Sequence, residues 1–187
     1  NLEGSKAYAK KFMQEFGVKT ARSMVFNSFV DAKEYLEKEK FPLVIKASGL
    51  AQGKGVVIAE DYDEALKTIH DFMIKKIYGD AGIQVVIEDY LKGFEVSIIA
   101  FCILKDIFPM ISAKDYKKVG NAGVGANTGG MGSLAPSPDF TMVHNRDFED
   151  NIMKPTLAGL KDNYLMFSGF IFFGLLVTEE GCHLLEY

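Results

Sequence analysis

The feature that most constrains the fold is a series of short apolar runs separated by glycine-containing turns. Leu43–Ala47 and Val56–Ala59 have the length of strands, and only the stretch Ser48–Gly55 separates them. Antiparallel strands can be joined by short connections, whereas parallel strands need a crossover of a dozen or more residues. The pattern therefore predicts mainly antiparallel sheets built from hairpin-connected strands.

Helical segments lie between these runs, so the predicted fold class is α+β. Tyr8, Phe12 and Phe16 recur every four residues, which indicates an amphipathic helix over Lys6–Phe16 that ends at Gly17. We also expect capped helices over 28–39 and 61–76, a helix over 147–161 bent near Pro155, and strands over 23–26, 84–90, 95–104, 107–111, 170–177 and 182–187.

Composition argues against several classes of protein. The net charge of −4 and the pI near 5.4 are unfavourable for phosphate-held nucleic acid. The most apolar stretch, Leu165–Val177, is shorter than the roughly 20 residues of a membrane helix, so we expect no membrane partner and a cytoplasmic location. Cys102 and Cys182 lie in apolar runs and are expected to be reduced core thiols. The three histidines lack ligand spacing.

The first chemical signal is the glycine-rich stretch that follows Lys46. Glycines expose backbone N–H groups and lysines add positive charge, which suits a polyphosphate. It is no P-loop, because Lys54 is followed by Gly55 instead of Ser or Thr, and a strand follows instead of a helix. A plain hairpin turn explains the stretch equally well. Lys46 favours an anionic partner, since a lysine at the end of an apolar strand is rarely left unpaired.

Acidic residues and a long loop give further signals. The strand 84–90 ends in acids, and Glu95 opens the next strand, an arrangement suited to adenine and ribose but also to a solvated strand end. Ser112–Pro138 is a long loop with lysines and an Asn-Thr-Gly-Gly turn, either a set of anion donors or a flexible surface loop. Glu186 is either a surface acid or, if it lies among buried leucines, a residue that needs a cation.

The order of these motifs closely resembles the phosphoribosylamine–glycine ligases of the ATP-grasp superfamily. The residues that carry the resemblance are Gly4–Lys6, Val44–Gly55, Val86–Leu91, Asp115–Lys118, Asn127–Gly132 and Leu185–Tyr187. The resemblance implies an ATP-grasp fold, with residues 21–88 as the lid lobe and residues 1–20 and 89–187 as most of the central lobe.

The same resemblance implies roles for individual residues. ATP-binding positions would be Lys6, Lys46, Ser48, Gly49, Gly53, Lys54, Gly55, Glu88, Asp89, Tyr90, Leu91 and Glu95. Substrate contacts would be Ser112, Asp115, Lys118, Asn127 and Gly129. Lys46 and Lys118 would be catalytic, and Glu186 would bind Mg²⁺ or Mn²⁺. The family often has arginine where Lys118 stands, and lysine keeps the charge without the bidentate geometry.

The resemblance implies ATP-dependent ligation of glycine to 5-phosphoribosylamine through glycyl phosphate, a step of purine synthesis. The partners would be ATP, both substrates and the remainder of a longer polypeptide, without which the fragment should be inactive. Two alternatives are another ATP-grasp carboxylate–amine ligase or carboxylase, and a nucleotide-binding module without turnover. All of these readings require residues from Lys6 to Glu186 to converge on one cleft.

Overall fold

The computed structural model describes residues 2–51, 54–103, 106–117, 119–120, 128–165 and 167–187. The chain forms two compact units. Unit 1 comprises Asn1–Phe12 and Ala21–Leu91, and unit 2 comprises Met13–Thr20 and Lys92–Tyr187. Helix α1 (Lys6–Glu15) belongs partly to each unit.

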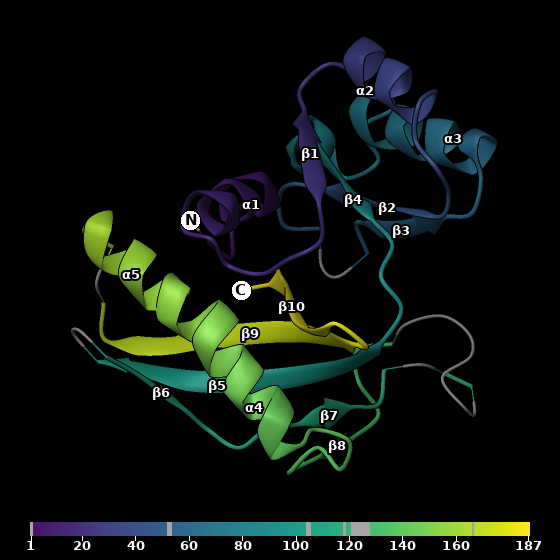
Figure 1. Cartoon of the computed structure of the whole chain (residues 1–187). Helices are drawn as coiled ribbons and strands as arrows, with labels where there is room; N and C mark the ends of the chain where they lie inside the picture. Colours follow the sequence, from purple (N-terminus) through teal and green to yellow (C-terminus); the bar gives the residue numbers. More distant parts are fainter. Residues whose placement is uncertain (1, 52–53, 104–105, 118, 121–127, 166) are drawn as a thin grey trace. The chain divides into compact units, whose positions relative to one another are not determined.

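Unit 1 contains a four-stranded antiparallel sheet with the strand order β1-β4-β2-β3. Its strands are β1 (Ser23–Phe26), β2 (Leu43–Ala47), β3 (Val56–Ala59) and β4 (Val85–Asp89). Helices α2 (Phe29–Leu36) and α3 (Tyr62–Met73) lie side by side against it (Figure 1). Buried side chains from these helices and strands, with Ala51, form its hydrophobic core.

The two predicted helix caps of unit 1 are confirmed. The Ser28 hydroxyl accepts a hydrogen bond from the Asp31 amide, and the Asp61 carboxylate accepts one from the Glu64 amide. Each satisfies a backbone donor that the first helical turn leaves unpaired. Both helices end about one turn before the predicted limits, which sequence periodicity defines poorly.

Helix α1 begins where the Ser5 hydroxyl accepts a hydrogen bond from the Tyr8 amide, and Gly17 follows it at φ +67°. The predicted buried face was only partly right. Phe12 is buried, but Tyr8 and Phe16 are half-buried, and Lys10 is among the buried residues of the helix.

Unit 2 contains a second four-stranded antiparallel sheet, with the order β10-β9-β5-β6. Its strands are β5 (Phe94–Ile103), β6 (Asp106–Pro109), β9 (Gly169–Thr178) and β10 (Gly181–Glu186). Alternate residues of β5 are buried, as expected for a strand with one covered face. The predicted α+β class with mainly antiparallel sheets is therefore confirmed.

The helical region of unit 2 differs from the prediction. It begins earlier, with α4 (Met142–Phe148), continues through a π-helical turn (Glu149–Met153) and ends with α5 (Lys154–Asp162). Thr141 and His144 form a reciprocal capping box. The usual sequence pattern does not predict it, because histidine stands in place of Glu or Gln. The predicted irregularity near Pro155 is the π-helical turn, just before the proline that lacks an N–H donor.

The long loop contains more order than the sequence suggested. Strands β7 (Lys114–Asp115) and β8 (Ser133–Leu134) pair in antiparallel register, and the segment before β7 pairs with β5 through the Ser97–Ala113 bridge. These pairings hold both ends of the loop beside the sheet of unit 2.

The division into units also differs from the lobes expected from the resemblance. Residues 1–12 pack with unit 1, because the Lys6 amide donates to the Ser48 carbonyl at 2.8 Å and the Lys10 ammonium pairs with Glu88. The assignment of the two units as lid and central lobes stays a prediction.

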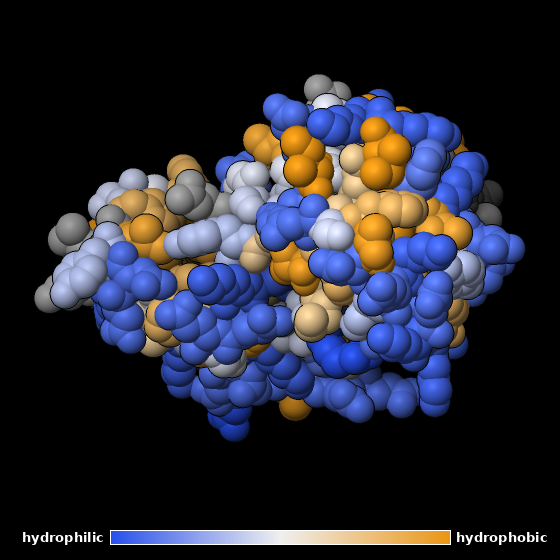
Figure 2. Space-filling model, turned by 90° about the horizontal axis from the view of Figure 1, so that it is seen from above, coloured by the Kyte–Doolittle hydropathy of each residue, from blue (hydrophilic) through white to orange (hydrophobic). Residues whose placement is uncertain are grey.

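The surface is mixed in polarity. On the face shown in Figure 2, apolar side chains form separate patches among hydrophilic ones. Within the described part of the chain, no helix is both long and apolar enough to cross a bilayer.

Candidate functional site

A buried cluster of charged side chains lies in unit 1. The Glu88 carboxylate pairs with the Lys46 ammonium at 2.9 Å and with the Lys10 ammonium at 3.2 Å. The three side chains are 2% (Glu88), 8% (Lys46) and 2% (Lys10) exposed. Burial of an ion is costly unless it is paired, so this cluster is a built feature of the fold.

Sheet register explains how the cluster forms. Val44 pairs with Glu88 and Lys46 pairs with Val86, so Lys46 and Glu88 are diagonal neighbours on one face of the sheet. Lys10 approaches from α1. Burial lowers the pKa of Lys10 to about 8, and the positive charge of Lys46 adds to this effect while Glu88 opposes it.

Ser48 links the start of α1 to the glycine-rich loop. Its hydroxyl donates to the Gln84 side chain at 3.1 Å and accepts a hydrogen bond from the Ala7 amide at 3.1 Å. The Lys6 ammonium donates to the Gly49 carbonyl at 3.3 Å. Lys6, Ser48 and Gly49 are therefore brought together, as the ATP assignment requires, but all three also hold the local fold.

The described glycines of the loop are needed for close packing within the chain. A Cβ atom on Gly49 would lie 2.7 Å from the Ala81 Cα, and one on Gly55 would lie 2.6 Å from the Ala51 Cβ. Lys54 is exposed, and its carbonyl accepts a hydrogen bond from the Tyr78 hydroxyl. Gly53 lies outside the described residues. These packing roles favour the hairpin interpretation for the backbone, and a phosphate role stays a proposal.

The predicted adenine segment follows the buried cluster along β4. The Asp89 carboxylate accepts two hydrogen bonds from the Arg22 guanidinium, each 2.9 Å long, at the protein surface. These bonds, with those to Glu39, raise the pKa of Arg22. Tyr90 is exposed, and Leu91 is the last residue of unit 1.

In unit 2, polar residues of β5 face polar residues of the long loop. The Glu95 carboxylate lies 3.7 Å from the Lys117 ammonium, and the Ser97 hydroxyl donates to the Asp115 carboxylate at 2.8 Å. The Ser97–Ala113 bridge places these residues opposite one another. Both pairs lie at the surface, unlike the cluster of unit 1.

The Thr-Gly-Gly-Met-Gly segment, residues 128–132, packs against the part of the long loop that contains Lys117. The Thr128 amide and hydroxyl both donate to the Lys117 carbonyl, at 2.7 and 2.9 Å. Gly130, at φ +109°, adopts a conformation that L side chains rarely take. Gly129 is exposed beside these residues. Lys118 and Asn127 lie outside the described residues.

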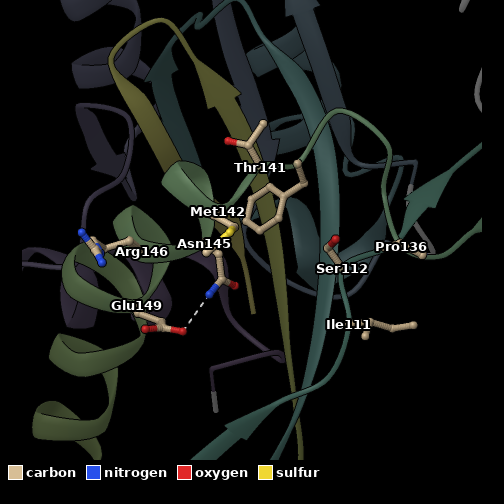
Figure 3. Close-up of a pocket in the computed structure, with 9 residues that line it drawn as sticks. Ile111, Ser112, Pro136, Thr141, Met142, Asn145, Arg146 and Glu149 are labelled. Carbon is tan, nitrogen blue, oxygen red and sulfur yellow. Dashed lines mark hydrogen bonds between the residues drawn. The ribbon is translucent and has the colours of Figure 1, made fainter.

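Ser112 lies beside a pocket of about 370 Å³ within unit 2. Figure 3 shows its lining residues, with the Asn145 amide donating to the Glu149 carboxylate at 2.8 Å. The Ser112 carbonyl accepts a hydrogen bond from the Ser137 amide at 3.0 Å. Asp115 and Gly129 do not line this pocket, so the described substrate residues are not gathered within it.

Glu186 is exposed at the end of β10, which agrees with the surface-acid alternative and not with a carboxylate among buried leucines. A register shift between Leu184 and Glu186 sets Glu186 opposite Gly174. The following Tyr187 is buried, and its hydroxyl lies 2.8 Å from the Thr156 hydroxyl. Among the described residues, no group of three or more His, Cys, Asp or Glu side chains could hold a metal ion.

Known proteins resemble the whole chain. Residues 4–187 match the family described as phosphoribosylglycinamide synthetase, ATP-grasp (A) domain. The chain belongs to this family. A phosphoribosylamine–glycine ligase from Clostridium acetobutylicum is 48% identical over 186 residues, and one from Fusobacterium nucleatum is 50% identical over 189 residues. The fold is thus an ATP-grasp domain.

A solved structure supports the same assignment. The phosphoribosylamine–glycine ligase of Thermotoga maritima matches all of this chain with a TM-score of 0.85 and 34% identity. The match covers 47% of that protein, and the two sequence relatives are covered to 45% and 44%. The chain therefore spans less than half the length of these phosphoribosylglycinamide synthetase relatives.

Within this ATP-grasp domain, three residues to which the sequence assigned no individual role contact predicted site residues. Lys10 completes the buried cluster, while Ser97 and Lys117 pair with the predicted residues Asp115 and Glu95. A signal for Lys10 was present, since it lies three residues from both Ala7 and Met13, which are buried on the same helix.

Proposed function

We propose that this chain supplies the ATP-binding part of an enzyme that joins glycine to 5-phosphoribosylamine. The family and the relatives named phosphoribosylamine–glycine ligase support these substrates. The observation that carries the proposal is the buried cluster of Lys10, Lys46 and Glu88, in which two ammonium groups lie beside one carboxylate. A buried positive charge favours an anionic ligand, and a phosphate of ATP is such a ligand.

The proposed reaction has two steps. A carboxylate oxygen of glycine attacks the γ-phosphorus of ATP, which forms glycyl phosphate and breaks the bond to ADP. The amine nitrogen of 5-phosphoribosylamine then attacks the glycyl carbonyl, phosphate leaves, and the nitrogen loses a proton as the amide forms. Such chemistry depends on positioning and charge neutralisation more than on covalent help from the protein.

The candidate residues would divide this work. Lys46 and Lys6 would bind phosphates, with the loop Ser48–Gly55 excluding water from the acyl phosphate. The segment Glu88–Leu91 would contact adenine, and Glu95 would accept hydrogen bonds from ribose. Substrate contacts would come from Ser112, Asp115, Lys118, Asn127 and Gly129.

Glu186 would bind Mg²⁺ or Mn²⁺ that accompanies ATP. Its exposed carboxylate fits this use, because Mg²⁺ is commonly held by one or two carboxylates together with substrate phosphates and water. When bound, the ion neutralises charge that develops on the phosphate oxygens. The rest of the longer polypeptide would complete the enzyme.

An ADP-release assay of the full-length protein tests the reaction. Sustained ADP release over many turnovers should require both glycine and 5-phosphoribosylamine. Turnover with bicarbonate in place of glycine would indicate a carboxylase. ATP binding without substrate-dependent ADP release would indicate a nucleotide-binding module, and either result would refute the proposal.

Lys46→Ala tests the phosphate role in the same full-length enzyme. Loss of one preorganised electrostatic donor should lower kcat/KM by about 10²–10³, or roughly 3–4 kcal/mol of transition-state stabilisation. Lys40→Ala, on an exposed lysine before β2, serves as the control and should change kcat/KM by less than about twofold. Unchanged kcat/KM in Lys46→Ala would contradict the assignment.

A further inference from the structure

The Arg22 side chain joins three separate parts of unit 1. Its Nε and Nη2 atoms each donate a hydrogen bond of 2.9 Å to the Asp89 carboxylate. Nη2 and Nη1 also donate to the Glu39 carboxylate, at 2.6 and 3.4 Å. Arg22 precedes β1, Glu39 follows α2, and Asp89 is the last residue of β4. A single surface ion pair contributes little to stability, but a bidentate guanidinium in a network is the exception.

The backbone around Asp89 is fixed on both sides. The Asp89 amide donates to the Arg22 carbonyl at 3.0 Å, and Asp89 pairs with Leu43 of the neighbouring strand β2. The pairing of β4 ends at this residue, so Tyr90 and Leu91 extend beyond the sheet ladder. Asp89 is therefore the point from which the next two residues take their direction.

The path of the chain gives this contact a second consequence. The continuous part of unit 1 runs from Ala21 to Leu91. Arg22 lies next to its first residue, and Asp89 lies two residues before its last. The pairing of these two side chains thus holds the two ends of this part together. Chain ends with few contacts open most easily, so the loss of this pairing should loosen the segment after β4 first.

Both oxygens of the Asp89 carboxylate are occupied by Arg22. In the proposed function, the segment Glu88–Leu91 contacts adenine. The carboxylate of Asp89 then serves to hold this segment, and the backbone groups that follow it would meet the base. A site built from hydrogen-bonding groups rejects an unmatched analogue strongly only when those groups stay in place.

We propose that Arg22 is a positioning residue for ATP, which binds Asp89 and so holds the backbone of Tyr90 and Leu91 where it distinguishes adenine from guanine. Arg22 acts through Asp89 and not through a contact with the nucleotide. The inference rests on the proposed function, because it takes the segment Glu88–Leu91 as the adenine contact. It goes further by assigning base selectivity to a residue outside the ATP-binding motifs.

Base selectivity separates this role from a purely structural one. Guanine carries an oxygen where adenine carries an amino group. A fixed backbone carbonyl that accepts a hydrogen bond from the amino group would repel this oxygen. If the segment loosens, adenine loses a matched contact while guanine escapes a mismatched one, so the preference for ATP falls. A structural role alone would reduce the amount of folded enzyme, which lowers the rates with both nucleotides equally and leaves the preference unchanged.

The experiment measures phosphate release by the full-length protein with ATP or GTP at saturating glycine and 5-phosphoribosylamine. Arg22→Gln should raise the KM of ATP by about three- to tenfold and leave kcat within about twofold, because binding is weakened and the reacting groups are untouched. The ratio of kcat/KM for ATP to that for GTP should fall by about threefold or more.

Lys75→Gln is the matched control. Lys75 is 57% exposed, compared with 58% for Arg22, and it pairs with Asp71 at 2.8 Å in the same unit. This substitution removes an equally exposed cation from an ion pair that has no part in the adenine segment. It should change neither the KM of ATP nor the preference for ATP.

Thermal unfolding checks that each variant is folded. Arg22→Lys keeps the charge without the planar guanidinium, and it replaces Arg22→Gln if the latter is not folded. It should shift KM and preference in the same direction. An unchanged preference for ATP in the folded Arg22 variant overturns the inference, whether or not kcat falls.

Failure of the proposed function gives a different result. It would appear in the original protein, as phosphate release that does not require both glycine and 5-phosphoribosylamine. Equal use of ATP and GTP by the original protein would remove the adenine contact, and this inference with it.

Discussion

The candidate site contains one buried ion pair in unit 1, Glu88 with Lys46, and one exposed ion pair in unit 2, Glu95 with Lys117. Glu88 and Lys46 are 2% and 8% exposed and 2.9 Å apart, whereas Glu95 and Lys117 are 64% and 40% exposed and 3.7 Å apart. Each pair joins a glutamate of one strand to a lysine from another part of the chain. The two pairs differ in how far their surroundings shield them from solvent.

Similar charged residues can therefore contribute to the stability of the fold to different degrees. Removal of one partner from a buried ion pair leaves an uncompensated charge, whereas an exposed pair is solvated and screened. Substitution of Glu88 or Lys46 should therefore alter stability and ligand binding together. In unit 2, the two effects should be separable.

The largest expected effect is that of Glu88→Ala. The substitution leaves Lys10 and Lys46 buried without the carboxylate that pairs with both, so the free energy of unfolding should fall by about 3–5 kcal/mol. Urea unfolding monitored by circular dichroism measures this change. Glu60→Ala, on an exposed residue of the same unit, should stay within about 0.5 kcal/mol. Equal effects of the two substitutions would break the comparison between buried and exposed charges.

Tyr187→Phe tests whether the loss of a buried but uncharged hydrogen bond also lowers the free energy of unfolding. Tyr187 and Thr156 share a buried hydrogen bond of 2.8 Å in unit 2, and burial raises the pKa of Tyr187. Loss of the Tyr187 hydroxyl should lower the free energy of unfolding by about 1–2 kcal/mol, because one buried polar partner is lost. Tyr164→Phe is the matched control, since Tyr164 is 94% exposed. If Tyr187→Phe lowers the free energy of unfolding as much as Glu88→Ala does, the charge of a buried group does not determine the size of the effect.

Sequence reasoning recovered the strands well because each apolar run is bounded by turn residues. Leu43–Ala47 and Val56–Ala59 have the predicted limits. It missed β7 and β8, since two-residue strands carry no measurable periodicity. It also missed the start of α4, where His144 supplies a capping interaction that the usual pattern does not include.

For the candidate site, local patterns identified individual residues but not their partners. Lys46 stood out because it interrupts an apolar strand, and a buried anionic partner was expected. That partner within the chain is Glu88, which the sequence had linked only to adenine. Register between β2 and β4 and the packing of α1 bring Lys10, Lys46 and Glu88 together, and these contacts are set by tertiary structure.

The pH dependence of stability sharpens the description of unit 1. The pKa of Lys10 is lowered to about 8 from about 10.5, so between these values the unfolded chain binds more protons than the folded protein. The free energy of unfolding should therefore rise with pH in this window. Relative to Lys10→Met, the original protein should gain about 1 kcal/mol between about pH 7 and about pH 9.

Urea unfolding of both proteins across this range measures the gain. Burial raises the pKa of Cys182 to about 12 and also raises that of Tyr187, which lowers stability at still higher pH. Both groups are present in the variant, so their contributions cancel in the difference. Parallel pH profiles of the two proteins would show that Lys10 is not desolvated as its burial indicates.

The smallest expected change in stability is that of Glu95→Ala. Its contact with Lys117 is long and exposed, so the free energy of unfolding should change by less than about 1 kcal/mol. If Glu95 accepts hydrogen bonds from ribose, the same substitution should nevertheless weaken MgATP binding by about tenfold, the loss of a hydrogen bond to a charged group. Calorimetry and urea unfolding of the same full-length sample measure the two quantities. Loss of affinity without loss of stability is the separation expected of unit 2, and a parallel loss of both would place Glu95 with the buried charges of unit 1.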